Sequence, residues 1–335
     1  MRANNTRMNI PWSGPPSPGA KQAFASVQVG RPTQERFAVP SVQANGMTLA
    51  FDAFGPENAE PILLVSGLGV QMIRWTGSFC GMLAAQGYRV IRFDNRDVGL
   101  STHLDDAPVI EMTALVQALG RGERPNLPYT LRDMADDAVG LLDALGIERA
   151  HVVGRSLGGV IAQSMAAEHP QRTLSMASIM STTGNPELPP PSPEAMSALT
   201  RPAPDPARDE SGYLTHCVAT AQVIASPGFP FDEGACRAQA LAELRRAYNP
   251  AGFSRQIAAM ATAGDRRARL NTIVAPTLVA HGADDPLIPV AGGRDTAANI
   301  KGSKLMVIKG MGHDLPIELH ETFALAIAAN ARRAA

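Results

Sequence analysis

A serine set between glycines constrains this chain more than any other feature of its sequence. Residues 151–159 read His-Val-Val-Gly-Arg-Ser-Leu-Gly-Gly, and an apolar, helix-forming stretch follows as far as Pro170. The pattern predicts a strand, a sharp turn and a helix, with Ser156 at the tip of the turn. Because such a turn brings backbone segments close together, side chains at Gly154 and Gly158 would collide there. A hydroxyl presented in this way suits a nucleophile, although the simpler alternative is an exposed serine in an ordinary turn.

Apolar runs alternate with helix-patterned stretches along most of the chain. A hairpin is expected first, because Ala44-Asn45-Gly46 separates two apolar-rich runs. The expected strands are 37–43, 47–54, 62–66, 89–93, 150–154, 174–180, 276–282 and 305–310, and the clearest helices are 131–145 and 323–331. This alternation predicts an α/β fold, a mostly parallel sheet flanked by helices, with ligands bound beyond the carboxyl ends of the strands.

The alternation stops between residues 183 and 264. Eight prolines lie between Pro186 and Pro206, and helical stretches such as 232–248 follow them. The segment is too long for a connecting loop, so we expect an inserted helical cap that shapes the substrate pocket. The expected organisation is a disordered tail at 1–35, a core at 36–182 and 265–335, and the cap at 183–264.

Charge and cysteine usage narrow the class of protein. The chain has 30 basic and 31 acidic residues, mixed along its length, which gives no sign of a nucleic-acid partner or a membrane surface. The first 35 residues contain no signal-peptide core, and no segment is long enough to span a membrane, so a cytoplasmic protein is expected. Cys80, Cys217 and Cys236 suit reduced thiols, although a bridge between Cys217 and Cys236 is an alternative.

A serine nucleophile needs a base, and His313 is the best candidate. It follows the last predicted strand in the glycine-rich loop Gly310-Met311-Gly312-His313-Asp314, which places it at the same edge of the sheet as Ser156. The alternative is a loop histidine that caps the following helix. The other histidines are interpreted as packing, loop or cap residues: His103, His151, His169, His216, His281 and His320.

The acid that orients the histidine should come from a loop between the nucleophile and the base. After the predicted strand 276–282 come Asp284 and Asp285, followed by Pro286. Asp285 precedes the proline and is therefore held extended. Its position favours Asp285 as the acid and Asp284 as a turn residue, while the reverse assignment stays open.

Acyl transfer also needs amide donors for the negative charge that develops on the substrate oxygen. The amide of Leu157 is one expected donor, because it lies at the start of the helix after Ser156. The loop after strand 62–66 should supply the second. There Ser66-Gly67-Leu68-Gly69-Val70 lets the backbone approach the substrate, and the amide of Leu68 is the expected donor.

Carboxylates also gather in residues 94–101, which read Asp-Asn-Arg-Asp-Val-Gly-Leu-Ser. A metal or phosphate site is one interpretation. We favour a turn, stabilised by its Asx and glycine residues, that braces the floor of the pocket. No metal, nucleotide or other cofactor is expected, because zinc-type spacing and glycine-rich phosphate-binding motifs are missing from the sequence.

Four segments together make the chain resemble the aclacinomycin methylesterase-like bacterial hydrolases of the α/β-hydrolase superfamily. These segments are 66–69, 94–101, 154–159 and 310–313. The resemblance implies a triad of Ser156, Asp285 and His313, a helical cap, and hydrolysis of small-molecule carboxylic esters without a cofactor. The chain departs from the family at Ser66, where many relatives carry a histidine.

The expected enzyme is a serine esterase that works through an acyl-enzyme intermediate. Within the same architecture, the alternative is a perhydrolase or cofactor-free haloperoxidase, which uses the same triad. From a different class, the alternative is a non-catalytic ligand receptor on a hydrolase scaffold. A receptor has less need of all three triad residues, so their presence favours the enzyme.

Overall fold

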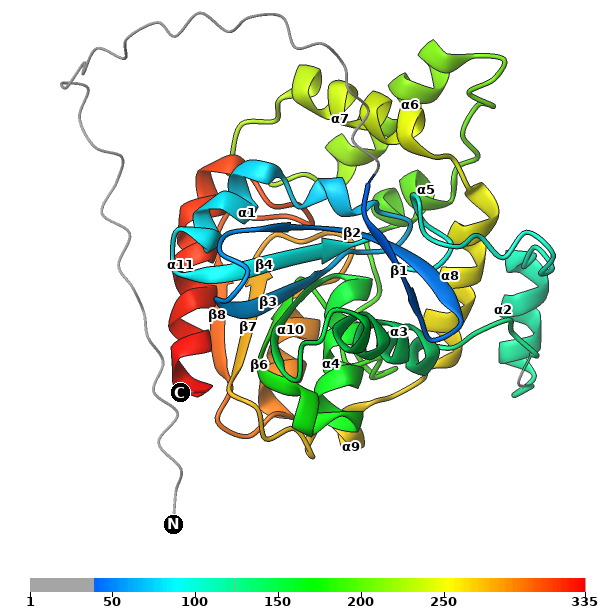
Figure 1. The fold of residues 1–335 in the computed structure, drawn as a ribbon. Helices are drawn as coiled ribbons and strands as arrows, with labels where there is room; N and C mark the ends of the chain where they lie inside the picture. The colour runs from blue at the N-terminus through cyan, green and yellow to red at the C-terminus, as the bar shows by residue number, and fades with distance from the viewer. Residues whose placement is uncertain (1–38, 124, 335) are drawn as a thin grey trace, which may run out of the picture. The chain divides into compact units, whose positions relative to one another are not determined.

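A single eight-stranded sheet organises the part of the chain that the structure describes (Figure 1). The computed structural model describes residues 39–123 and 125–334, so the tail expected at 1–35 lies outside them. Pro40–Ala335 form one compact unit. The strands are β1 (Ser41–Ala44), β2 (Met47–Phe54), β3 (Glu60–Val65), β4 (Tyr88–Phe93), β5 (Ala150–Arg155), β6 (Thr173–Ile179), β7 (Thr277–Gly282) and β8 (Lys304–Ile308).

The strand order is β1-β2-β4-β3-β5-β6-β7-β8, and every pair from β4 to β8 is parallel. The mostly parallel α/β sheet predicted from the sequence is confirmed. The predicted hairpin is present, with Asn45 and Gly46 at φ values of 48° and 75° in its two-residue turn. Residues 37 and 38 of its predicted first strand lie outside the described residues, and the strand begins at Ser41, because Pro40 has no N–H to donate to the ladder.

Helices alternate with the strands along the sequence. They are α1 (Gly77–Ala84), α2 (Met112–Gly120), α3 (Leu131–Ala144), α4 (Leu157–Glu168), α5 (Pro193–Thr200), α6 (Glu210–Ile224), α7 (Glu233–Arg246), α8 (Pro250–Thr262), α9 (Arg267–Leu270), α10 (Val290–Ala298) and α11 (His320–Ala331). Short 3-10 helices lie at Met72–Arg74, Pro170–Arg172, Ile317–Leu319 and Arg332–Ala334.

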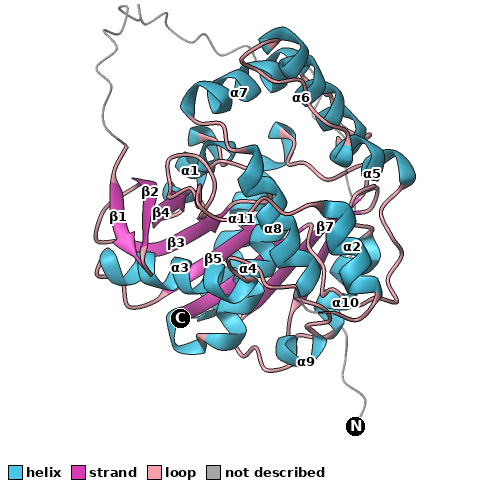
Figure 2. Ribbon diagram, turned by 90° about the vertical axis from the view of Figure 1, so that its right-hand side faces the viewer, coloured by secondary structure: helices cyan, strands magenta, loops and turns pink. Residues whose placement is uncertain are grey.

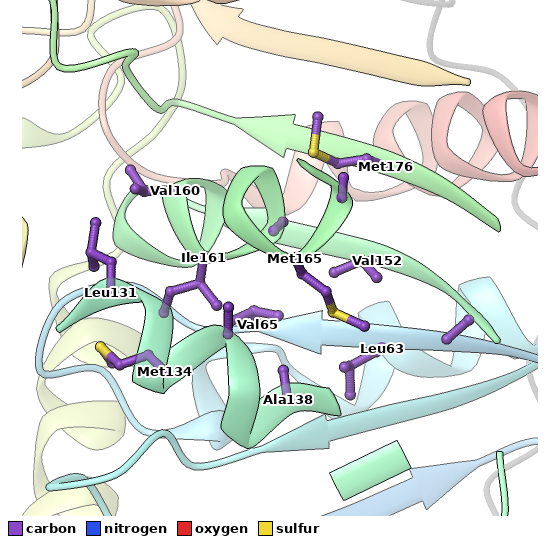
Figure 3. Packing of buried hydrophobic residues seen from close by; sticks show 14 of the residues in the cluster. Leu63, Val65, Leu131, Met134, Ala138, Val152, Val160, Ile161, Met165 and Met176 are labelled. Carbon is purple, nitrogen blue, oxygen red and sulfur yellow. The ribbon is translucent and has the colours of Figure 1, made fainter. Parts of the chain in front are cut away.

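Helices cover both faces of the sheet. On one face pack α3 and α4, toward which Leu63 and Val65 of β3 and Val152 of β5 point (Figure 3). On the other face α1 and α11 pack near Ile62 and Leu64 of β3. Because successive side chains of a strand point to opposite faces, the continuous apolar run of β3 is buried on both.

Helices α5 to α8 interrupt the alternation between β6 and β7. We call this segment the α5–α8 insertion. Its helices begin at polar caps: the side chains of Ser192, Asp209, Asp232 and Asn249 each accept a backbone amide of the helix that follows. Figure 2 shows α6 and α7 side by side, away from the strands.

Several element ends differ from those predicted, among them the following three. The strand expected to reach residue 180 ends at Ile179, because Met180 adopts a φ of 44° that a strand cannot continue. The strand expected to reach residue 310 ends at Ile308, two residues before Gly310 with its φ of 80°. The closing helix begins at His320, three residues before the expected start.

Candidate active site

Ser156 lies in the turn between β5 and α4, at the carboxyl end of its strand. Its φ of 54° and ψ of −123° belong to a region that residues other than glycine rarely adopt. A Cβ on Gly154 would lie 1.9 Å from the carbonyl oxygen of Gly158, and a Cβ on Gly158 would lie 2.2 Å from that of Val65. The two glycines are therefore required on steric grounds, as the sequence pattern predicted.

The side chain of His313 lies between Ser156 and Asp285. Its Nε2 is 3.0 Å from Oγ of Ser156, and its Nδ1 is 2.7 Å from Oδ2 of Asp285. The three side chains come from loops after β5, β7 and β8, far apart in the sequence. The structure thus brings the three predicted site residues into one continuous chain of hydrogen bonds.

Asp285 is buried, and several donors hold its carboxylate in place. Its Oδ1 accepts the amides of Leu287 and Ile288 at 2.9 and 2.8 Å. Burial opposes ionisation, but hydrogen bonds from His281 and His313 lower the pKa of Asp285 to about 2. The carboxylate is therefore ionised at neutral pH and can stabilise a positive charge on the neighbouring imidazole.

The adjacent Asp284 points elsewhere and is exposed. Its Oδ2 accepts the amide of Gly310 at 2.7 Å, which braces the loop that leads from β8 to His313. Of the two aspartates that compete in the sequence, it is Asp285 that contacts the histidine.

A second histidine, His281, lies beside the same carboxylate. Its ring is fully buried, and its Nε2 lies 2.7 Å from the carbonyl oxygen of Ile288 and 3.4 Å from Oδ2 of Asp285. The interpretation of His281 as a packing residue missed this contact. The available signal was its position at the end of a predicted strand, four residues before Asp285.

The loop that follows β3 lies against the serine. A Cβ on Gly67 would be 3.4 Å from the Cβ of Ser156, so a larger residue at Gly67 would press on the nucleophile. Within residues 39–123 and 125–334, no hydrogen bond engages the backbone amides of Leu68 and Leu157. Both predicted donors therefore belong to segments at the serine, and neither amide has a partner within the described residues.

Gln256 of α8 connects the α5–α8 insertion to this loop. Its side chain is fully buried. Its Oε1 accepts the amide of Gly69 at 2.8 Å, and its Nε2 donates to the carbonyl oxygen of Arg96 at 2.9 Å. Phe253, one turn earlier on α8, packs over Gly69, where a Cβ would lie 2.8 Å from the ring. No sequence pattern selects either of these two residues of α8.

The loop that carries His313 is also bound to the insertion. The backbone amide of His313 donates to the carbonyl oxygen of Ile224 at 2.8 Å, at the end of α6. The amide of Gly312 donates to Oγ of Ser226 at 2.9 Å, and the amide of Gly228 donates to the carbonyl oxygen of Gly310 at 2.9 Å. These three bonds tie the residues after β8 to the connection between α6 and α7.

Residues 94–101 form a turn, but their carboxylates also bind the insertion. Asp94 accepts the amide of Met72 at 2.7 Å and pairs with Arg246 of α7 at 2.5 Å. Asp97 pairs with Arg255 of α8 through two contacts of 2.8 Å, and both side chains are buried. The carboxylates that suggested a metal site in the sequence are therefore held by arginines from a segment far along the chain.

Comparison with known proteins identifies the family of this chain. The alpha/beta hydrolase fold family matches residues 60–222. A protein named as a rhodomycin D methylesterase, from a Streptomyces species, is 30% identical over 86% of this chain and 96% of its own length. The chain belongs to the alpha/beta hydrolase fold family. The predicted family resemblance and the prediction of a hydrolase are both confirmed.

Two further likenesses concern the family and its fold. A protein of Variovorax paradoxus, named as a carbamate hydrolase, is 31% identical over 80% of this alpha/beta hydrolase and 90% of its own length. A solved structure of a meta-cleavage product hydrolase from Pseudomonas fluorescens has a TM-score of 0.69 at 20% identity, and covers 88% of this chain and 98% of that one. At that identity the structural likeness speaks for the fold alone.

Other features of this alpha/beta hydrolase concern metals, thiols and membranes. Among its described residues, no group of three or more histidine, cysteine, aspartate or glutamate side chains is placed to hold a metal ion. The three cysteines are free, and burial raises the pKa of Cys80 to about 12. No helix in the described part of the chain is both long and apolar enough to cross a membrane.

Proposed function

We propose that this hydrolase cleaves carboxylic esters of small alcohols through an acyl-enzyme intermediate on Ser156. The observation that carries the proposal is the hydrogen-bonded chain from Oγ of Ser156 through His313 to Asp285. A relative named as a methylesterase, matched over most of both chains, favours an ester as the bond that is cleaved.

In the first half of the proposed reaction, Nε2 of His313 accepts the proton of the Ser156 hydroxyl as Oγ attacks the ester carbonyl. The resulting imidazolium is stabilised by Asp285, which is ionised at neutral pH. The negative charge on the carbonyl oxygen is received by the amides of Leu68 and Leu157. His313 then protonates the alcohol, which leaves as the acyl group stays on Oγ.

In the second half, His313 accepts a proton from a water molecule, whose oxygen attacks the acyl carbon. The tetrahedral intermediate collapses, Oγ of Ser156 regains its proton from the histidine, and a carboxylic acid is released. The sequence of steps consumes one water for each ester and needs no oxidant, reductant or metal.

We take the α5–α8 insertion to be a cap that forms one wall of the substrate space. Its contacts support this role, because α6, α7 and α8 bind the His313 loop, the 94–101 turn and the loop after β3. A wall made by a separate segment lets substrate selectivity change without altering the triad.

The experiment is hydrolysis of methyl and p-nitrophenyl esters by the wild type and by Ser156→Ala, with labelling by a fluorophosphonate. We expect ester hydrolysis and labelling in the wild type, and a loss of about 10⁴-fold or more in the variant. Cys80→Ser, a buried thiol away from the triad, is the matched control for labelling. Labelling without ester hydrolysis would favour another reaction of the same triad, such as perhydrolysis. Hydrolysis that survives in Ser156→Ala would refute the proposal.

A further inference from the structure

Arg155 immediately precedes Ser156 as the last residue of β5. Its guanidinium lies 5.0 Å above the ring centroid of Trp75, which is itself buried. The side chain is only partly exposed. Across the described residues, 39–123 and 125–334, no hydrogen bond or ion pair engages this guanidinium, although its residue directly precedes the nucleophile.

Three charged groups lie near enough to act on Arg155: Arg74, Glu243 and Asp314. Arg74 follows the loop after β3, and Asp314 is the neighbour of His313, so both belong to segments that border Ser156. Glu243 belongs to α7, in the α5–α8 insertion. The guanidinium therefore lies where the sheet edge and the insertion meet.

The two carboxylates in this group are already engaged. Glu243 accepts hydrogen bonds from Nε and Nη2 of Arg74 at 2.7 and 2.6 Å. Asp314 pairs with the hydroxyl of Ser226, and burial raises its pKa. Neither carboxylate makes a hydrogen bond to Arg155, whose planar guanidinium keeps its N–H donors for another partner.

Stacking on an indole leaves the N–H donors of this partly exposed guanidinium open to water or to a bound anion. Burial and the like charge of Arg74 lower the pKa of Arg155 to about 10, so the group is still charged at neutral pH. A bound anion would complete this environment. A guanidinium can bind a carboxylate through two parallel hydrogen bonds. Its single positive charge balances the charge of one carboxylate, whereas a dianionic phosphate would keep one negative charge unbalanced.

We propose that Arg155 binds a carboxylate of the substrate, so that the ester cleaved at Ser156 is a monoester of a dicarboxylic acid. The inference rests on the proposed esterase function and adds the class of substrate. Arg155 would hold the free carboxylate while the ester carbonyl lies at Oγ of the next residue. The residue before the nucleophile would then set specificity, and the nucleophile itself would perform the reaction.

The test compares monomethyl glutarate with dimethyl glutarate, which differ in one negative charge. We expect the wild type to have a higher kcat/KM for the monoester, and Arg155→Gln to reduce the ratio of the two values by about 10- to 100-fold. Arg245→Gln removes a charge from an exposed position on α7 and should leave the ratio unchanged. A wild type without preference for the monoester, or an Arg155→Gln ratio equal to that of the wild type, would overturn the proposal.

A binding measurement separates this inference from the esterase proposal and covers a failure of Arg155→Gln to fold. Monomethyl glutarate is titrated calorimetrically into Ser156→Ala, with and without Arg155→Lys, which keeps the charge but loses the planar pair of donors. We expect the lysine to weaken binding of the monoester by about 10-fold and binding of dimethyl glutarate much less. Equal losses for both esters, or no binding of the monoester to Ser156→Ala, would rule out the carboxylate site even where Ser156 proves to be the nucleophile.

Discussion

The side-chain oxygen of Gln256 lies 2.8 Å from the backbone nitrogen of Gly69, across 187 residues of sequence. Gly69 follows Leu68, whose amide we propose as an oxyanion donor. The position of that donor therefore depends on a side chain from α8. Gln256 acts as a positioning residue, because its hydrogen bonds reach the loop and the carbonyl of Arg96 rather than a reacting atom.

Replacing Gln256 with methionine should lower kcat by about 10- to 100-fold and change KM much less, since a misplaced donor weakens binding of the transition state more than that of the ester. Steady-state kinetics on one ester give both constants. Gln163→Met is the matched control: Gln163 is equally buried, but its Nε2 donates to Ser178, away from the loop. Equal losses of kcat in the two variants would show that removing any buried side-chain amide lowers kcat, and that the hydrogen bond to the loop after β3 has no special effect.

Replacing Asp285 with asparagine should lower kcat by about 10³- to 10⁴-fold, because the amide can no longer stabilise the imidazolium. Asp284→Asn makes the same chemical change one residue away, at an exposed side chain, and should alter kcat by less than about threefold. If Asp284→Asn had the larger effect, the geometric assignment of the acid would be wrong.

Asp285 should also make the stability of the protein depend on acid pH. Its pKa is lowered to about 2 in the folded chain, below the ordinary value of 3.8, so the unfolded chain binds more protons between these values. The stabilisation is therefore complete above about pH 4 and is lost as the pH falls toward 2. Urea unfolding of the wild type and of Asp285→Asn should show a difference in free energy that shrinks over this window, whereas a difference that grew as the pH fell would contradict the lowered pKa.

Adding a methyl group at Gly158 should destabilise the protein by at least about 2 kcal/mol, because the Cβ would lie 2.2 Å from the carbonyl oxygen of Val65 and 2.6 Å from that of Ser66. Gly81→Ala, in α1, is the control, since a Cβ at Gly81 meets no atom within 4 Å. Alanine in a helix should then stabilise by about 0.5–1 kcal/mol. Urea unfolding measures both changes, and similar values for the two variants would contradict the steric role of Gly158.

The parts of the site that the sequence predicted are those specified by local patterns. Ser156 and His313 each follow a recognisable strand and lie in a glycine-rich turn, so a short stretch of sequence places them at the same edge of the sheet. The helical insertion was detectable because it interrupts a regular alternation. Each of these predictions depends on contacts within one or two neighbouring elements.

The parts that the sequence missed depend on contacts between distant segments. Gln256 lies in a helix whose residues carry no motif, and its role appears only when α8 is packed on the loop after β3. Asp97 and Arg255, which form an ion pair, are 158 residues apart in the sequence. The local pattern around Asp97 therefore indicated only a turn. His281 is a residue of β7, and its contact with Asp285 forms only because the chain turns back after the strand, so the strand pattern alone did not predict it.

The three hydrogen bonds between the His313 loop and the connection from α6 to α7 have a consequence for how this architecture can change in evolution. The α5–α8 insertion supplies hydrogen-bond acceptors for backbone amides of the loop that carries His313. It therefore cannot be exchanged for another segment unless these hydrogen bonds are kept. A chimera with the insertion of another hydrolase would have to bring its own equivalents of the Ile224 carbonyl and the Ser226 hydroxyl. Substitutions within α6 and α7 are therefore an easier route to a new substrate than replacement of the whole segment.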